Sequence, residues 1–261
     1  MERIDGSELG AGARCVTPRR RCRTPGRSPH PVRFRQVLSV ALLGALVMTA
    51  WPAGAVDQPT PALKLAWLAD DPDYVDVSAW PRVHTNLRYA TDHNFLKTNI
   101  YGDFNRCFLH RVAADKLGKA AALLAEQKPG WKFLVFDCLR PRSIQEKLYA
   151  VVAGTAQQAY VANPRTGSIH NFGLAIDLSL QDQDGREVDM GTAFDDFSSL
   201  SEPRLEKKFL AEGRLSRQQH ENRLLLRGIM EGAGFIQLAN EWWHYDALPK
   251  TQVRANYKIV K

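Results

Sequence analysis

Two histidines lie in surroundings that suit metal chemistry. His170 belongs to the run Ser168-Ile-His-Asn-Phe-Gly-Leu-Ala-Ile-Asp177, and His244 ends the run Glu241-Trp-Trp-His. Taken singly, each run has a simpler explanation: a histidine can cap a glycine turn, a strand aspartate can bind backbone N–H groups, and a tryptophan-rich strand is usually core. Together the runs meet a specific requirement, because a catalytic zinc needs three His, Asp or Glu ligands and an open position for water.

His170, Asp177 and His244 supply such a His₂Asp set, and we expect one zinc ion per chain. The seven-residue gap between the first two cannot place both side chains on one helical face, as an i,i+4 spacing does. It predicts a loop ligand and a strand ligand, brought together by a bend at Gly173. Glu241, three residues before His244, is the carboxylate available to take a proton from water and pass it to the leaving amine. These two side chains would point to opposite faces of an ideal strand, so a bulge or bend is expected between them.

Three helices that could help to position these residues are expected from apolar periodicity and from start and stop signals. The Ala/Leu-rich segment 111–127 is followed by Pro129-Gly130, which ends it. Capping-box patterns begin the other two: Ser143 with Glu146 opens a helix to about residue 159, and Ser216 with Gln219 opens one to about residue 231.

Strands are expected where apolar and aromatic residues run between turn signals, namely at 132–138, 174–180, 235–239 and 241–246. Asp184-Gly185 is a turn signal that could join the second of these to 186–190 in a hairpin. Helices separate groups of strands without strict β-α-β alternation, which indicates an α+β fold with a mainly antiparallel sheet flanked by helices. Residues 56–80 are rich in Pro and Asp and are expected to be an extended lead-in. The sequence has no internal repeat and no low-complexity linker after residue 62, so residues 56–261 are expected to form one domain.

An N-terminal targeting segment is expected before that domain. Residues 37–50 form an uncharged, mostly apolar run, shorter than the roughly 20 residues that a membrane-spanning helix needs. Arginines precede the run and Ala53-Gly54-Ala55 follows it, the arrangement of a secretory signal peptide. We therefore expect residues 1–55 to be an N-terminal extension and signal peptide that is cleaved after Ala55. This predicts a periplasmic or secreted protein with no stable membrane insertion. A buried core helix at 37–50 is the alternative.

The net charge is unevenly distributed along the chain. There are 35 basic and 28 acidic residues, for a formal charge of +7. Nine arginines and three acids fall in residues 1–55, so residues 56–261 hold 26 basic and 25 acidic residues and a charge of only +1. The domain thus has no excess positive charge to neutralise phosphates, and no nucleic-acid partner is expected. A length of 261 residues with 44% hydrophobic residues also excludes a collagen, a disordered tail protein and a multi-span membrane protein.

Cysteine usage agrees with export. Cys15 and Cys22 lie in the segment expected to be removed, which leaves Cys107 and Cys138. Two cysteines in an exported domain suggest one disulfide between them. Two reduced, buried thiols are the alternative, and zinc binding by cysteine is disfavoured because neither belongs to a close C-x-x-C pair.

The histidine motifs also carry a family resemblance. The pattern S-x-H-x-x-G-x-A-x-D, followed about 70 residues later by E-x-W-H, resembles the zinc D,D-peptidase family of bacterial cell-wall metabolism, which shares its fold with the Hedgehog signalling domain. Within that family the chain is most similar to the D-alanyl-D-alanine dipeptidases, including those of vancomycin resistance. The resemblance covers about residues 83–247. It implies hydrolysis of a small dipeptide substrate, D-Ala-D-Ala, to two D-alanines.

The resemblance implies that His170, Asp177 and His244 bind zinc and that Glu241 is the catalytic base. Arg140, in Asp137-Cys-Leu-Arg-Pro, matches an arginine that stabilises the oxyanion formed as water attacks the peptide carbonyl, a task suited to a fixed cation. Leu139 stands where the family's D-x-Y-R-P element has tyrosine.

Three further residues match the dipeptidases in particular: Tyr89, Ser168 and Asp195. The resemblance implies that they hold the free amino terminus of the substrate. A carboxylate facing an ammonium group, with hydroxyl groups beside it, is suited to that task.

Three other functions are compatible with parts of this pattern. A D,D-carboxypeptidase would trim the terminal D-Ala from longer peptidoglycan stems, but Asp195 as an amino-terminus clamp would exclude a longer chain. A non-catalytic zinc module could bind cell-wall peptides or a partner protein, but binding alone needs neither Glu241 nor Arg140. An envelope structural protein would leave the His/Asp/His/Glu set unexplained.

Overall fold

The computed structural model describes residues 63–261, so the expected signal peptide and its cleavage site lie outside the described residues. The helices of this part are α1 (Arg111–Gln127), α2 (Arg142–Val152), α3 (Glu206–Ala211), α4 (Arg217–Gly232) and α5 (Lys250–Asn256). The strands are β1 (Tyr74–Asp76), β2 (Val83–Thr85), β3 (Phe108–His110), β4 (Lys132–Asp137), β5 (Ala175–Gln181), β6 (Ile236–Gln237) and β7 (His244–Asp246). Within residues 63–261, no helix combines the length and the apolar character needed to cross a membrane.

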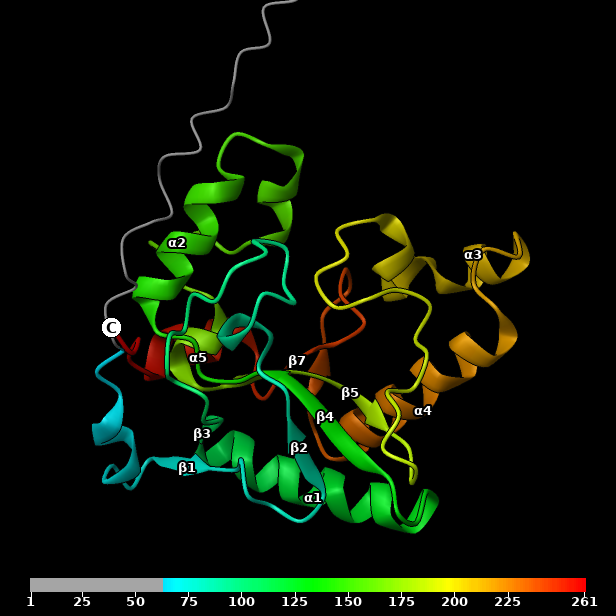
Figure 1. Cartoon of the computed structure of the whole chain (residues 1–261), viewed down its shortest axis with the longest axis horizontal. Helices are drawn as coiled ribbons and strands as arrows, with labels where there is room; N and C mark the ends of the chain where they lie inside the picture. The colour runs from blue at the N-terminus through cyan, green and yellow to red at the C-terminus, as the bar shows by residue number, and fades with distance from the viewer. Residues whose placement is uncertain (1–62) are drawn as a thin grey trace, which may run out of the picture. The chain divides into compact units, whose positions relative to one another are not determined.

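A five-stranded sheet with the order β2-β4-β5-β7-β6 forms the centre of the domain, and β1 pairs with β3 in a small second sheet (Figure 1). The predicted α+β class is confirmed. The large sheet is mixed, however, because β2 runs parallel to β4 while the other neighbouring pairs are antiparallel. A parallel pair needs a long crossover, and here the chain passes through β3 and α1 between the two strands. The three residues of β2 carry no sequence signal that would have predicted this pairing.

Helix α1 has the bounds that its sequence predicts. Its buried face repeats at helical spacing through Ala113, Leu117, Ala120 and Leu124. This face packs against β3, β4 and α4, and α1 and α4 lie along the same side of the large sheet (Figure 1). The predicted capping box of α4 is also present, with the Ser216 hydroxyl accepting from the Gln219 backbone N–H at 3.1 Å.

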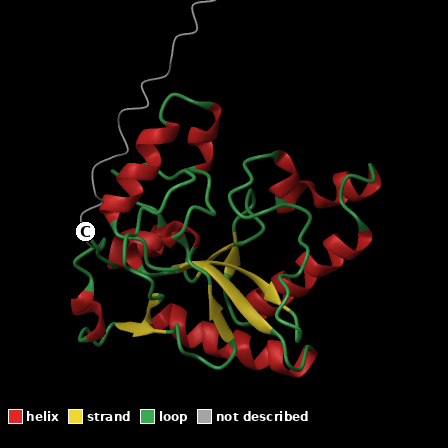
Figure 2. Cartoon of the chain, viewed as in Figure 1, coloured by secondary structure: helices red, strands yellow, loops and turns green. Residues whose placement is uncertain are grey.

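The two central strands are buried on both faces. Every residue of β4 after Lys132 and every residue of β5 before Gln181 is buried. A two-sided burial requires cover on each side of the sheet, and Figure 2 shows that loops provide much of the cover opposite α1. Those loops also carry several of the candidate site residues.

Helix α2 differs from its prediction at both ends. The expected capping box does not form, because the helix already begins at Arg142, after Pro141, and Glu146 instead pairs with Arg142 at 3.3 Å. The helix ends at Val152 rather than near residue 159, since Gly154 adopts a positive φ of 77° that an α-helix cannot continue. Residues 156–160 form a separate 3₁₀ turn.

Several strands are shorter than predicted. The predicted strands at 235–239 and 241–246 reduce to β6 and β7, because a turn at Ala239-Asn240 follows the first and a turn at Trp242-Trp243 precedes the second. The proposed hairpin partner 186–190 forms only a single bridge, between Gln181 and Glu187. The lead-in before residue 80 is not wholly extended, since it contains a 3₁₀ turn at Ala66–Ala69 as well as β1.

Candidate active site

Three side-chain atoms converge at the end of the large sheet. His170 Nε2 lies 3.2 Å from Asp177 Oδ1 and 3.1 Å from His244 Nδ1, and His244 Nδ1 lies 2.9 Å from Asp177 Oδ1. Ligands about 2.0–2.1 Å from a tetrahedral zinc ion stand roughly 3.3 Å apart, so this triangle needs only a slight expansion to hold the ion. His170, Asp177 and His244, called the ligand triangle below, thus form a group that could bind a metal, with donor types that zinc accepts.

Sheet register and one tight turn bring these ligands together. The antiparallel pairing of β5 with β7 places Asp177 directly opposite His244. His170 lies in a 3₁₀ turn, Ile169–Phe172, that ends at Gly173 with a φ of 66°. A Cβ atom at Gly173 would meet the His110 backbone nitrogen at 2.9 Å, so glycine is required by the space as well as by the backbone angle. The predicted bend at Gly173 is therefore present.

Both histidines are oriented through their second ring nitrogen. His170 Nδ1 lies 2.6 Å from the carbonyl oxygen of Cys138, and His244 Nε2 lies 2.8 Å from Asp246 Oδ1. A histidine that ligates a metal usually donates its other N–H to a carbonyl or carboxylate, which fixes the ring and its tautomer. The two imidazoles are therefore held with one nitrogen facing the ligand triangle.

Electrostatics within the cluster favour the charged form of the Asp177 carboxylate. Burial raises the pKa of Asp177, but the imidazoles of His170 and His244 outweigh it and hold that pKa well below its usual range. Burial likewise lowers the pKa of His244, yet the carboxylates of Asp246 and Asp177 raise it to about 10. Without a metal, the cluster thus balances its buried negative charge with a proton on His244. A bound dication would supply that positive charge instead.

Glu241 lies beside the ligand triangle at the start of the turn that leads into β7. Its Oε2 is 4.0 Å from His244 Nδ1, and the residue is buried. Burial raises the pKa of the Glu241 carboxyl to about 7. The turn at Trp242-Trp243 provides the predicted bend, because it lets Glu241 and His244 face the same cavity although they are three residues apart.

Four neighbours surround the Arg140 guanidinium group. Its Nε and Nη2 atoms lie 2.8 and 2.7 Å from Asp137 Oδ2, and its Nη1 donates to Gln145 Oε1 at 3.0 Å. Its guanidinium carbon lies 5.0 Å from the centre of the Tyr89 ring, and Nη2 is 3.6 Å from Asp177 Oδ2. The cation is therefore held at the edge of the ligand triangle.

Leu139, where the family has tyrosine, turns away from this site. It is 1% exposed and belongs to a small apolar cluster with Leu65, Leu68, Phe108 and Val260. Leu139 thus contributes apolar packing and takes no part in the side-chain hydrogen bonds of Arg140.

The residues matched to amino-terminus recognition line the same cavity. The Tyr89 hydroxyl donates to Asp195 Oδ1 at 3.2 Å, while Asp195 Oδ2 is buried without a hydrogen-bond partner among the described residues. Burial raises the pKa of Asp195 well above its usual range, and its φ of 61° is rare for a residue other than glycine. Ser168 borders the cavity too, and its hydroxyl accepts from the His170 backbone N–H at 3.3 Å.

The cavity around these groups is small. Its volume is about 200 Å³, and ligand, base, arginine and Asp195 side chains all line it. Pockets for drug-sized ligands are typically about 300–1,000 Å³, so this one suits a substrate of dipeptide size.

Several residues of the site were not predicted from the sequence. Asp246 orients His244, Gln145 and Tyr101 support the Arg140–Asp137 pair, and Lys250 and Arg254 add cations to the cavity lining. Asp246 carried a usable signal, because residues two apart in a strand share a face and Asp246 follows His244 by two. The others come from elements whose contacts with the site depend on the tertiary fold.

The predicted disulfide between Cys107 and Cys138 is present. It excludes, for these residues, the alternatives of two reduced thiols and of zinc ligation.

Comparisons with known proteins agree with the motif resemblance. A family model described as D-ala-D-ala dipeptidase matches residues 73–260. The D-alanyl-D-alanine dipeptidase of Escherichia coli is 32% identical over 194 residues, which are 74% of this chain and 92% of the relative. The enzyme of the same name from Enterococcus faecium is 32% identical over 183 residues, covering 62% and 85% of the two chains. A third, from Synechocystis, is 31% identical over 160 residues, or 50% and 65%.

The matched region contains the ligand triangle, Glu241, Arg140 and the whole cavity lining. The family model matches most of the chain, and the chain covers most of the Escherichia coli relative, so together they establish the family. The chain belongs to the D-Ala-D-Ala dipeptidase family and is a metallopeptidase.

Proposed function

We propose that this protein is a zinc-dependent dipeptidase that hydrolyses D-alanyl-D-alanine to two D-alanines. The observation that carries the proposal is the joint presence, in one cavity of dipeptide size, of the ligand triangle and of the unpartnered oxygen of Asp195. The first suits a metal, and the second suits the ammonium group of a free amino terminus.

His170, Asp177 and His244 would hold one zinc ion per chain. Their donor atoms converge at a separation that suits tetrahedral coordination, and both histidines have their second nitrogen bonded. When bound in such a site, zinc polarises the substrate carbonyl and lowers the pKa of water.

Glu241 would act as general base and then as general acid. It would take a proton from the attacking water and deliver it to the amine that leaves, which requires a carboxyl group able to do both near neutral pH. Its burial beside His244 suits that task, and it is not one of the converging ligands.

Arg140 would stabilise the negative charge that develops on the carbonyl oxygen. Its side chain is already ordered by Asp137 and Gln145, so little reorganisation is needed when that charge appears. A cation of this kind raises the rate when it binds the transition state more tightly than the substrate.

Charges of both signs in the cavity would recognise the two ends of a zwitterionic dipeptide. Asp195, with the hydroxyl groups of Tyr89 and Ser168, would accept the ammonium group. Lys250 and Arg254 from α5 supply cations that the substrate carboxylate could approach. A longer peptide has no ammonium group at that position, so recognition of this kind favours dipeptides over peptidoglycan stems.

A D,D-carboxypeptidase is the second candidate, since it would use the same metal, base and arginine. The buried side chain of Asp195 disfavours it, because an uncharged peptide group there would offer no cation to this desolvated carboxyl group, whereas the ammonium group of a free dipeptide would stabilise its charged form. A non-catalytic binding module would leave the position of Glu241 without a purpose.

We further propose that the protein acts in the periplasm or outside the cell after removal of residues 1–55. The signal-peptide pattern and the disulfide support this, because disulfides persist in oxidising compartments. An exported enzyme cannot deplete cytoplasmic D-Ala-D-Ala, which favours recovery of nutrients from wall turnover over antibiotic resistance.

Hydrolysis of D-Ala-D-Ala and of N-acetyl-D-Ala-D-Ala, each with and without a chelator, tests the proposal. We expect the free dipeptide to have a kcat/KM at least about a hundredfold higher, at ~1.4 kcal/mol per tenfold, and we expect zinc to restore activity after chelation. Equal hydrolysis of the two substrates would favour the carboxypeptidase. Failure to cleave either would favour the binding module, and activity that persists in metal-free protein would exclude the zinc mechanism.

A further inference from the structure

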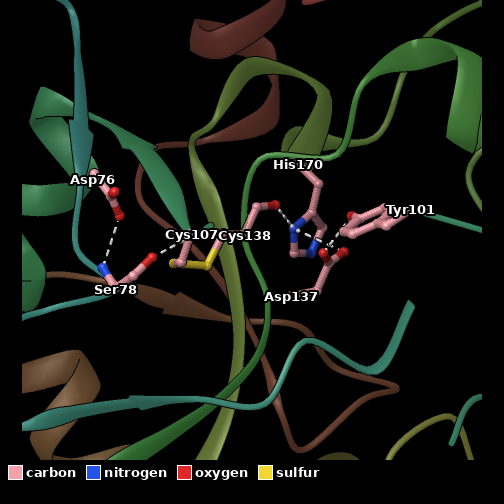
Figure 3. The surroundings of a disulfide bond; sticks show 7 residues. All are labelled: Asp76, Ser78, Tyr101, Cys107, Asp137, Cys138 and His170. Atoms are coloured by element: carbon pink, nitrogen blue, oxygen red, sulfur yellow. Dashed lines mark hydrogen bonds and ion pairs between the residues drawn. A yellow bond between two sulfur atoms is a disulfide. The ribbon is translucent and has the colours of Figure 1, made fainter. Parts of the chain in front are cut away.

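The Cys107–Cys138 disulfide joins two segments at the border of the candidate site. Cys107 directly precedes β3, and Cys138 directly follows β4, 31 residues later in the chain. Both cysteines are buried, with 0% and 1% of their surface exposed. Figure 3 shows the bond between Ser78 on one side and Asp137 and His170 on the other.

Cys138 and its neighbour Asp137 orient two functional candidates. The carbonyl oxygen of Cys138 accepts the hydrogen bond from His170 Nδ1 at 2.6 Å. Asp137 holds the guanidinium group of Arg140 at 2.7 Å and accepts from the Tyr101 hydroxyl at 2.6 Å. Two consecutive residues therefore set the direction of a ligand imidazole and of the cation beside it.

The sheet does not fix the backbone at this position. The register of β4 against β5 shifts between Val135 and Asp137, and the last paired residue is Asp137, opposite Asp177. Cys138 lies just beyond that last pair. Two backbone hydrogen bonds still hold the residues that follow it: Leu139 N–H donates to the Phe108 carbonyl of β3 at 3.0 Å, and Arg140 N–H donates to the His170 carbonyl at 3.1 Å.

Cys107, in contrast, is firmly anchored. Its N–H donates to the Ser78 hydroxyl at 2.7 Å, and its carbonyl accepts from the Val77 N–H at 2.9 Å. The disulfide thus ties a residue that the sheet leaves free to one that the neighbouring segment holds.

We propose that Cys138, through its disulfide to Cys107, is a positioning residue for His170 and Arg140, so that opening the bond weakens zinc binding and slows turnover. The inference rests on the proposed function and adds that the disulfide influences the geometry of the same site. Loss of an outer partner of a metal ligand typically lowers metal affinity by about 10–100-fold. We expect the lower figure, about tenfold, because the carbonyl group is displaced rather than removed.

The open form can be made in two ways. The Cys107→Ala/Cys138→Ala variant removes both sulfur atoms, and Cys107→Ser/Cys138→Ser is the alternative if the first does not fold. Reduction of the wild type by a water-soluble phosphine gives the same open form without substitution. The phosphine supplies two electrons and takes the oxygen of water as phosphine oxide, and two thiols form. A phosphine is preferred to a dithiol, whose sulfur atoms would compete for zinc.

The test compares zinc affinity and kinetics in the oxidised wild type, the open form and a Leu124→Ala control. Leu124 is buried in the last turn of α1, at the end of the helix remote from its junction with β3, so its truncation lowers stability without altering the sequence of the disulfide segment. Zinc affinity is measured by competition with a chromophoric chelator, and the absorption spectrum of cobalt-loaded protein reports ligand geometry. The open form should bind zinc about tenfold more weakly and show an altered cobalt spectrum. The fold decrease in its kcat should be larger than the fold increase in its KM. The control should keep wild-type zinc affinity at a similarly lowered Tm.

The inference fails if a folded open form matches the oxidised wild type in zinc affinity, cobalt spectrum and kcat. It also fails if the Leu124→Ala control loses zinc affinity to the same extent, because the effect would then follow general stability. Absence of stoichiometric zinc binding by the oxidised wild type would instead overturn the proposed function itself.

Discussion

The cavity is bounded by two regions that are built differently. On one side, the ligand triangle is presented largely by paired strands, and the distal nitrogens of both histidines are hydrogen-bonded. On the other side, Asp195 belongs to a loop, residues 189–198, with a positive φ and one carboxylate oxygen without a partner in the described part of the chain. The first region is complete in its hydrogen bonds, whereas the second keeps a strong acceptor available.

In the proposed function, this difference corresponds to two tasks. A metal centre must be rigid before its ligand arrives, because ligand geometry sets affinity, and strands provide that rigidity. Recognition of a charged end group instead needs a carboxylate that is desolvated and has an unpaired oxygen. A substrate with a free ammonium group then gains more binding free energy there than a longer substrate with an uncharged peptide group. The loop is still anchored, since Arg223 of α4 donates to the Met190 carbonyl at 2.6 Å.

Replacing a ligand should have the largest effect. His170→Ala or His244→Ala removes one of three ligands, so we expect loss of stoichiometric zinc and of measurable dipeptidase activity. Metal analysis and a D-Ala-D-Ala assay measure both. His84→Ala on β2, a histidine outside the ligand triangle, is the matched control and should keep wild-type zinc content. A ligand variant with full zinc and activity would break the assignment of the ligand triangle.

Replacing the base should separate metal binding from turnover. Glu241→Gln keeps the shape of the side chain and removes its ability to accept a proton. We expect kcat to fall by about 10²–10⁴-fold, the usual contribution of general acid–base catalysis, while zinc content stays at one per chain. A variant that keeps more than about a tenth of wild-type kcat would require another base.

The Asp195 side should respond to the substrate rather than to the metal. Asp195→Asn retains a side chain that tolerates positive φ but loses the charge, so kcat/KM for D-Ala-D-Ala should fall about a hundredfold, or ~2.7 kcal/mol. The loss on N-acetyl-D-Ala-D-Ala should be much smaller. Asp196→Asn, the neighbouring carboxylate outside the catalytic cavity, is the control. Equal losses on both substrates would show that Asp195 supports the loop and not the ammonium group.

The smallest effect is expected for the partner of a ligand. Asp246→Asn keeps a hydrogen bond to His244 possible but removes the negative charge, so zinc affinity should fall by about 10–100-fold. A chelator competition titration measures the change, and activity at saturating zinc should largely recover. Unchanged affinity would mean that the β5–β7 pairing alone orients His244.

The ligand side was also the easier one to predict from the sequence. His170, Asp177 and His244 were identified because residue types and spacing limit the chemistry, and the α1 bounds followed from periodicity and a Pro-Gly stop. The role of Tyr101, far from Asp137 in the chain, has no local signal. Similarly, the early end of α2 depends on the backbone angle at Gly154, and a glycine alone does not reveal it.

The β5–β7 pairing has a consequence for the order of folding. Asp177 and His170 are separated from His244 by 67 and 74 residues, so no unfolded chain offers a preformed set of ligands. A site made of such distant segments closes late, since long loops must be ordered before their contacts form. Metal that binds only the native state adds its binding free energy to stability, ~2.7 kcal/mol at a concentration of about 100 Kd. Zinc bound at this site would thus stabilise the completed fold, in addition to its part in the reaction.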